Sequence, residues 1–148
     1  MNKKRLVGVL LFSIAGLIVW FSFVAHFGEL GFSNNNESLF GAASVFISAA
    51  TSSFLISPII FRLEKNRNIY IKAFGLGVFI ALISMLIGSY IFSIVIIFED
   101  IFALSDYLFF GFYGFIFSVI VMSPGLILGG LTGVLLHYLA NKFDPKTG

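Results

Sequence analysis

Few residues in this chain have side chains suited to acid–base or metal chemistry, and they lie near the ends of long apolar runs. Glu99, Asp100 and Asp106 are close together in the sequence, and His26 lies at the end of another run. Carboxylate oxygens are ligands that Ca²⁺ and Mg²⁺ prefer, but this spacing matches no defined cation-binding loop. We therefore interpret these acids as a solvated rim, with a cation site as the alternative, and expect no metal or other cofactor.

The two histidines are poorly placed to share a metal. His26 lies near the end of the first apolar run and His137 near the end of the last. If both runs cross a membrane, the two side chains lie a membrane thickness apart, roughly 30 Å, so haem ligation by both within one chain is excluded. We expect His137 to stabilise the end of its own helix, where a cation is favoured, with pH sensing as the alternative. The chain has no cysteine, which excludes disulfides and thiolate metal sites.

Four apolar runs must position these side chains: residues 6–27, 39–61, 70–98 and 108–139. Each reaches the length of about 20 apolar residues that a helix needs to cross a bilayer, and none alternates as barrel strands do. The first run is long and bulky for a cleaved signal peptide, which is the alternative. The sequence predicts an all-α polytopic membrane protein, a four-transmembrane-helix bundle that forms a single domain over residues 1–148.

The basic residues predict the orientation of these helices. All nine Lys and Arg residues lie before the first run, between residues 62 and 72, or after the last run. The other two connections carry acids and no base. Because bases are retained on the cytoplasmic side of a membrane, we expect both termini to be cytoplasmic. The expected location is a bacterial-type inner membrane, with the lipid bilayer as the surrounding medium.

The membrane interior is expected to contain no Asp, Glu or Arg, and Lys72 can reach back to the headgroups from the start of its run. Proton-coupled transporters and intramembrane hydrolases need an ionisable group among their helices. The small multidrug transporter family has four spans and a similar size, but it relies on a Glu in its first span, where this chain has no acid. We therefore expect no enzyme activity. The bases do not form a nucleic-acid-binding stripe either.

Small residues recur at four-residue spacing in two runs, which places each set on one helical face. Gly125, Gly129 and Gly133 form one face, and Ser44, Ser48 and Ser52 form the other. Small residues allow helix backbones to approach closely in lipid. We expect both sets to be helix-packing faces, against a helix of the same chain, a second copy or another protein. The second run, with small residues on two sides, is expected to be central.

Two prolines predict irregular helices, because proline lacks an N–H donor and disturbs the preceding turn. Pro58 lies near the end of its run, where the disturbance is mild, and Pro124 lies inside the last run. At about 1.5 Å per residue the run 108–139 reaches roughly 48 Å, more than the hydrocarbon core needs. A kink at Pro124, a tilt or an interfacial segment is expected to absorb the excess.

Eleven of the twenty phenylalanines lie in the parts of the chain that are expected to be near the outer leaflet. Phe109, Phe110 and Phe112 are examples. They are either lipid-facing residues or an outer docking surface for another membrane protein or a lipid.

These observations favour a non-enzymatic protein that packs laterally against a membrane partner or against itself, as an accessory subunit or an immunity-type protein does. In span count and size the chain is similar to the small polytopic colicin-immunity proteins, although it shares no motif with them. The alternative is a homo-oligomeric passive channel or small-solute transporter, in which the glycine face of the last run packs around a pore.

Overall fold

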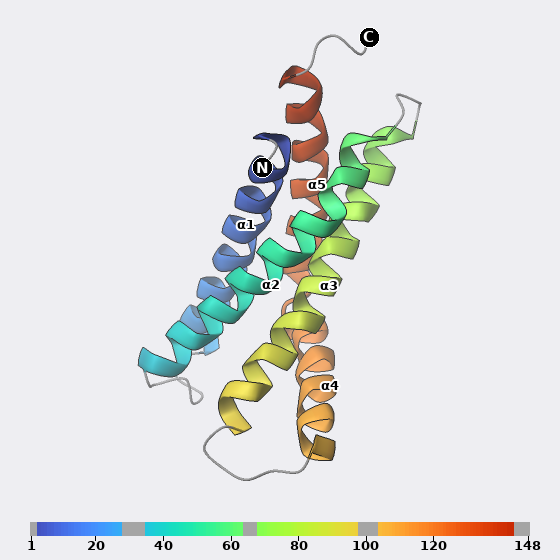
Figure 1. The fold of residues 1–148 in the computed structure, drawn as a ribbon. Coiled ribbons are helices and arrows are strands. Elements are labelled where there is room, and N and C mark those ends of the chain that lie inside the picture. The colour runs from blue at the N-terminus through green and yellow to red at the C-terminus, as the bar shows by residue number, and fades with distance from the viewer. Residues whose placement is uncertain (1–2, 28–34, 64–67, 98–103, 144–148) are drawn as a thin grey trace.

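The computed structural model describes residues 3–27, 35–63, 68–97 and 104–143, and within them the regular structure is entirely helical (Figure 1). The elements are α1 (Lys3–Phe27), α2 (Asn35–Phe61), α3 (Ile69–Ile97), α4 (Leu104–Val121) and α5 (Ser123–Phe143). The predicted all-α class is therefore confirmed.

Four of these helices are long and apolar enough to cross a membrane. Their apolar parts are Lys3–His26, Ser38–Phe61, Ile69–Ile94 and Ser123–Lys142, with mean hydropathies of 2.5, 1.8, 2.2 and 1.3. The apolar part of α4, Ser105–Val121, is shorter. Length and composition together thus support a multi-pass membrane protein.

The last apolar run forms two helices, where the sequence predicted one span over residues 108–139. Helix α4 ends at Val121, Met122 lies in a turn, and α5 begins at Ser123. Pro124 has no N–H group and cannot continue the helical hydrogen bonding to Ile120. The next donor, the Gly125 N–H, bonds the Met122 carbonyl three residues back at 2.7 Å. In contrast, α2 continues through Pro58 to Phe61.

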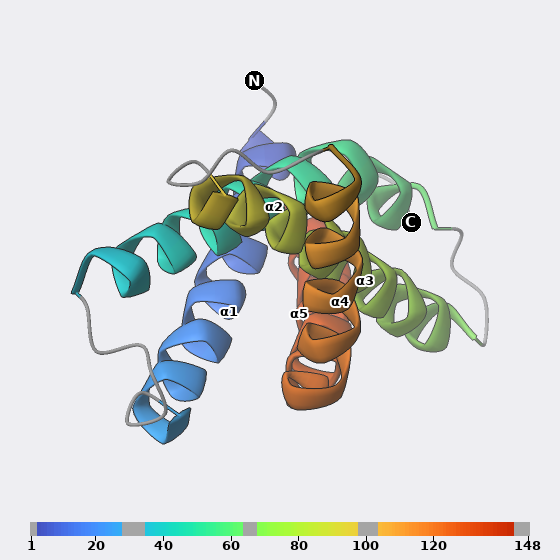
Figure 2. The ribbon, with the colours of Figure 1, turned by 90° about the horizontal axis from the view of Figure 1, so that it is seen from below.

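The helices pack in an order that differs from their order in the chain. Helix α3 contacts α5, α2 and α4, whereas α1 contacts α2 and α5 (Figures 1 and 2). The sequence of α3 is rich in Ile, Leu, Val and Phe. Although much of its surface is exposed, α3 packs most extensively against α5, α2 and α4, while α5 also contacts α1, α2 and α4.

The closest approach between helices involves glycines of α3 and α5. A Cβ atom added at Gly133 would meet the Ala73 carbonyl oxygen and lie 2.9 Å from the Gly77 Cα. A Cβ added at Gly129 would lie 3.0 Å from the Gly77 carbonyl oxygen. Since the obstructing atoms are backbone, they cannot rotate away as a side chain can. This glycine face therefore packs against α3 of the same chain.

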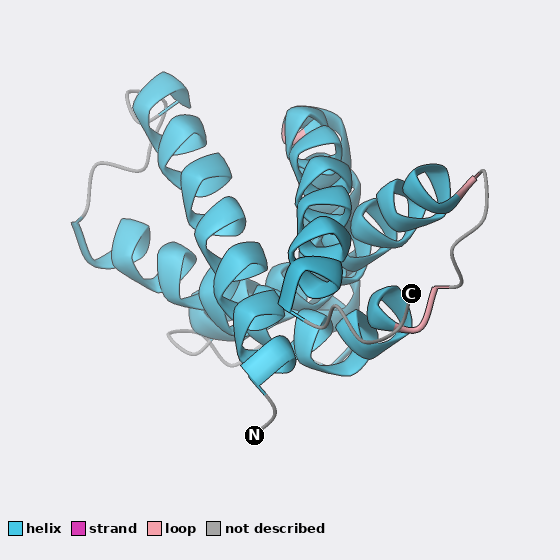
Figure 3. Ribbon diagram, turned by 90° about the horizontal axis from the view of Figure 1, so that it is seen from above, coloured by secondary structure: helices cyan, strands magenta, loops and turns pink. Residues whose placement is uncertain are grey.

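The charges separate along the long axis of the molecule. The first residues of α1, the end of α2, the start of α3 and the end of α5 lie at one end in Figure 1, and Figure 3 is a view from above, toward this end. These segments carry Lys3, Lys4, Arg62, Lys72 and Lys142. We call this the basic end. The described acidic residues, Glu37 in α2 and Asp106 in α4, belong to the first turns of helices that begin at the opposite end.

We predict that Gly133→Ala lowers the free energy of unfolding by about 1–3 kcal/mol, because the added methyl group overpacks the contact with α3. The matched control is Gly75→Ala, since a Cβ at this position in α3 meets nothing within 4 Å. It should change stability by less than about 0.5 kcal/mol. Thermal unfolding in detergent micelles, followed by circular dichroism, measures both. Equal losses in the two variants would contradict this account of the α3–α5 contact.

Candidate functional site

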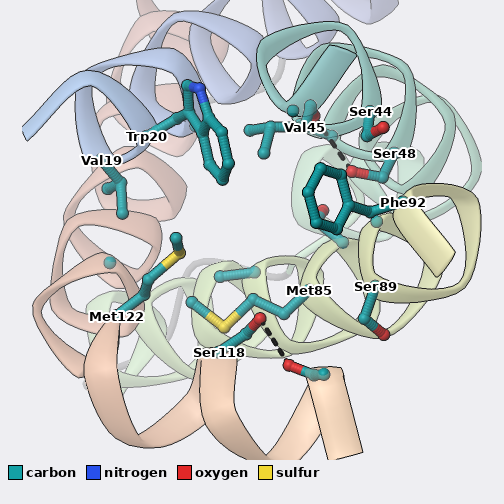
Figure 4. A pocket seen from close by; sticks show the side chains of 18 of the residues that line it. Val19, Trp20, Ser44, Val45, Ser48, Met85, Ser89, Phe92, Ser118 and Met122 are labelled. Atoms are coloured by element: carbon teal, nitrogen blue, oxygen red, sulfur yellow. Dashed lines mark hydrogen bonds between the residues drawn. The ribbon is translucent and has the colours of Figure 1, made fainter. Parts of the chain in front are cut away.

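A partly open cavity of about 500 Å³ lies between the helices, and all five contribute to its wall. Some wall residues, such as Tyr113 and Phe117, are more than 50% exposed. Figure 4 shows Val19 and Trp20 of α1 on one side of the space, with Ser48 and Phe92 across it. Met85, Ser118 and Met122 close another side. Protein interiors contain few voids larger than a water molecule, so a space of this size is the main candidate for a binding site.

The serines in the wall do not present free donors to the cavity. Each hydroxyl donates to a backbone carbonyl of its own helix, three or four residues earlier, at 2.7–3.0 Å. The six residues are Ser44, Ser48, Ser84, Ser89, Ser93 and Ser118. Such bonds satisfy a hydroxyl without a cross-helix partner. The wall therefore behaves as a mostly apolar surface despite its serine content.

The remaining wall residues are also apolar, apart from the phenol of Tyr113. They are aliphatic, aromatic, Met, Ala or Gly, and none of the described residues that line the cavity is Asp, Glu, Lys, Arg or His. A general acid or base other than a phenol is therefore missing from this wall. The chemistry that the cavity supports is apolar binding.

Trp20 lies on the aromatic side of the cavity and is held in place by ring contacts and a hydrogen bond. Its ring centroid lies 5.8 Å from that of Phe23 and 6.3 Å from that of Phe92. The indole Nε1–H donates to the Ser38 carbonyl at 3.2 Å, which joins α1 to α2. The ring also occupies the space in which a Gly41 side chain would lie. Trp20 is held at one edge by a hydrogen bond and on one side by close contact with a glycine backbone.

Small residues explain why the helices enclose space here. A Cβ at Gly16 would lie 3.0 Å from Val45, and one at Gly88 would lie 3.1 Å from the Ser48 hydroxyl. Helices α1 and α3 therefore approach α2 closely at these points. Between the points of contact, small residues leave volume that larger side chains would fill.

The structure places the predicted packing residues at different sites. Ser44 and Ser48 line the cavity together with Gly125 and Gly129, whereas Ser52 is buried outside its wall and Gly133 packs on α3. Of the predicted docking surface, Phe110 lines the cavity, while the Phe109 and Phe112 side chains are 56% and 53% exposed. Neither Pro58 nor Pro124 belongs to the wall.

Sequence reasoning missed the contribution of α3. Gly77, Ala81, Ser84 and Gly88 follow one another at helical spacings of four, three and four residues. All but Gly77 line the cavity, and Gly77 makes the glycine contact with α5. This stripe was a readable signal, because small residues at these spacings lie on one helical face. The abundance of Ile, Leu and Phe around it concealed the pattern.

His137 lies outside the cavity, where it joins α5 to α2. The buried imidazole Nδ1 lies 3.3 Å from the Ile60 carbonyl oxygen, and Nε2 lies 2.9 Å from the Asn141 amide nitrogen. If Asn141 donates to Nε2, the Nδ1–H donates to Ile60, which is the assignment that satisfies both contacts. His137 thus provides a partner for a carbonyl in the last turn of α2.

Among the described residues, no three His, Asp or Glu side chains are grouped so that they could hold a metal ion. Two residues of the possible acidic rim, Glu99 and Asp100, lie outside the described residues.

We predict that Trp20→Phe lowers the free energy of unfolding by about 1–2 kcal/mol. The change removes the hydrogen bond to Ser38 and enlarges the cavity by the difference between the two rings. Phe21→Leu is the control, because the neighbouring Phe21 side chain is 57% exposed and does not line the cavity. Circular dichroism in detergent reports both transitions. A Trp20→Phe variant as stable as the control would show that the indole does not tie α1 to α2.

Comparison with known proteins identifies no relative, since no protein-family model, curated protein or solved structure matches this chain.

Proposed function

We propose that this chain is a non-enzymatic integral membrane protein that binds an apolar molecule in the cavity between its helices. The observation that carries the proposal is the combination of a volume of about 500 Å³ with a wall whose serine hydroxyls are bonded within their own helices. Small-molecule sites commonly measure about 300–1,000 Å³. A hydrocarbon chain suits such a wall better than a polar solute, which would lose its hydrogen bonds to water without replacement.

The environment of the protein supports this choice of ligand. A cavity with a mostly apolar wall accepts apolar molecules. A bilayer supplies acyl chains at high local concentration, so the cavity does not need to select its ligand from dilute solution. The proposed occupant is therefore a hydrocarbon chain that belongs to, or is dissolved in, the membrane.

Lateral binding of a membrane partner, in the manner of an accessory subunit or an immunity-type protein, is the second candidate. It is favoured by the exposed aromatic side chains of α4, where Phe109, Phe112, Tyr113 and Phe117 are each more than 50% exposed. The apolar part of this helix is shorter than the other four. A homo-oligomeric channel is a further candidate, although Gly129 and Gly133 of the face that it would use lie against α3 of the same chain.

The proposed topology keeps both termini in the cytoplasm, in a bacterial-type inner membrane. The basic end would then face the cytoplasm, in agreement with the retention of Lys and Arg on that side. The proposal rests on the separation of charges along the molecule and on the helices able to span a membrane.

Trp20 provides a direct test of the cavity, because it is the only tryptophan in the chain and lines the space. We expect palmitic acid brominated along its chain to quench the Trp20 fluorescence of the protein in micelles. Ser118→Leu should reduce this quenching at least about fivefold, because the larger side chain occupies the cavity near Met85. Ser118→Ala, which removes only the hydroxyl, should leave the quenching unchanged.

Equal quenching in Ser118→Leu and Ser118→Ala would mean that bromine reaches the indole from outside the helices, and the cavity proposal would fail. Circular dichroism of both variants checks that the helices are retained.

The topology can be tested with single cysteines, since the natural chain has none. We expect Asn68→Cys, at the basic end, to resist a membrane-impermeant maleimide in intact cells and to react after lysis. Ser105→Cys, at the start of α4, should react in intact cells, because both side chains are exposed but lie at opposite ends. The reverse labelling pattern would overturn the proposed orientation.

A further inference from the structure

A second hollow, of about 430 Å³, lies at the basic end between the start of α1, the end of α2 and the second half of α5. We call it the basic groove. Its lining combines the Lys3 and Lys4 side chains with apolar residues, which include Val7, Phe61, Leu136 and Leu139. It shares no lining residue with the cavity between the five helices. Anything that binds here is therefore bound at a separate site.

The groove has two chemically distinct parts. Lys3 is exposed, Lys4 is half-buried, and both side chains line the groove. A Lys side chain can cover apolar surface with its methylene stem while its charge stays in a polar environment. The apolar part is formed by α1, α2 and α5, and Leu136 within it is only 1% exposed. A ligand that fits both parts must carry a negative charge next to a hydrocarbon segment.

The surroundings add to the positive charge. Arg62 belongs to the same end of the molecule and is exposed. The described acids, Glu37 and Asp106, lie at the other end, whereas Glu64 and Asp144 are outside the described residues. The N-terminal end of a helix also carries a partial positive charge, which favours an anion beside the first turn of α1. The charge at the groove therefore complements an anionic headgroup.

We propose that the basic groove binds one anionic phospholipid. The phosphate would accept charge-assisted hydrogen bonds from the Lys3 and Lys4 ammonium groups, and an acyl chain would lie along Val7, Leu136 and Leu139. A free phosphate ion would leave the apolar part unused. Basic hollows between membrane helices are suited to lipids of this charge, since each Lys or Arg near an anionic surface contributes about 1 kcal/mol.

Native mass spectrometry of the purified full chain tests this site, with dioleoyl phosphatidylglycerol and dioleoyl phosphatidylcholine titrated in separate experiments. We expect one tightly bound phosphatidylglycerol and at least about tenfold weaker binding of phosphatidylcholine. The double variant Lys3→Gln/Lys4→Gln should weaken phosphatidylglycerol binding about ten- to thirtyfold. The matched control is Lys72→Gln/Lys142→Gln, which removes the same charge from the same end but outside the groove. It should change binding less than about threefold.

Equal weakening in the two double variants would overturn the proposal, because it would indicate attraction to the general charge of the basic end. Equal affinity for the two lipids would overturn it as well. Inorganic phosphate serves as a competitor: displacement of the lipid by millimolar phosphate would identify an anion site in place of a phospholipid site. Retention of the bound lipid in millimolar phosphate supports a phospholipid site, provided that both double variants have unchanged circular dichroism. None of these readouts depends on Trp20 or on occupancy of the cavity between the five helices.

Discussion

The close approach of α3 to α5 is the contact on which the rest of the packing depends. Between apolar helices in lipid there is almost no hydrophobic driving force, so dispersion between closely packed surfaces must hold them together. Gly77 on α3 and Gly133 on α5 allow this approach, because any Cβ on Gly133 would meet the α3 backbone. With α5 held in this way, α3 offers its other sides to α2 and α4, and α1 closes the group by contacting α2 and α5.

The same class of residue has opposite effects in two parts of the molecule. Where two glycines face each other across α3 and α5, the backbones touch and no space remains. Where small residues of several helices face a common centre, as Ala15, Ser84 and Ser118 do, they leave the cavity. Trp20 limits this space on one side, since its ring packs against Gly41 and its N–H bonds the Ser38 carbonyl. Small side chains thus produce either a contact or a cavity, depending on the distance between the helix axes.

Much of the secondary structure could be predicted from the sequence, because hydropathy is summed along a continuous segment. The ends of α1 and α2 lie close to the predicted ends of the first two runs. The last run is divided in the structure: its hydropathy continues through Pro124, while the helical hydrogen bonding does not, so α4 ends at Val121 and α5 begins at Ser123. The cavity was not predicted at all, since its wall is assembled from side chains on all five helices.

The sequence by itself determined that the chain is helical, that four helices are apolar enough to span a membrane, and that its bases and acids are separated. These properties depend on neighbours in the chain and on the length of each run. The tertiary structure alone decided which faces meet. Stripes of small residues occur on α2, α3 and α5, and spacing along one helix does not specify which stripe on another helix it contacts. Only the three-dimensional arrangement pairs Gly133 with α3, turns Ser44 and Ser48 toward a shared cavity, and leaves Phe109 and Phe112 exposed.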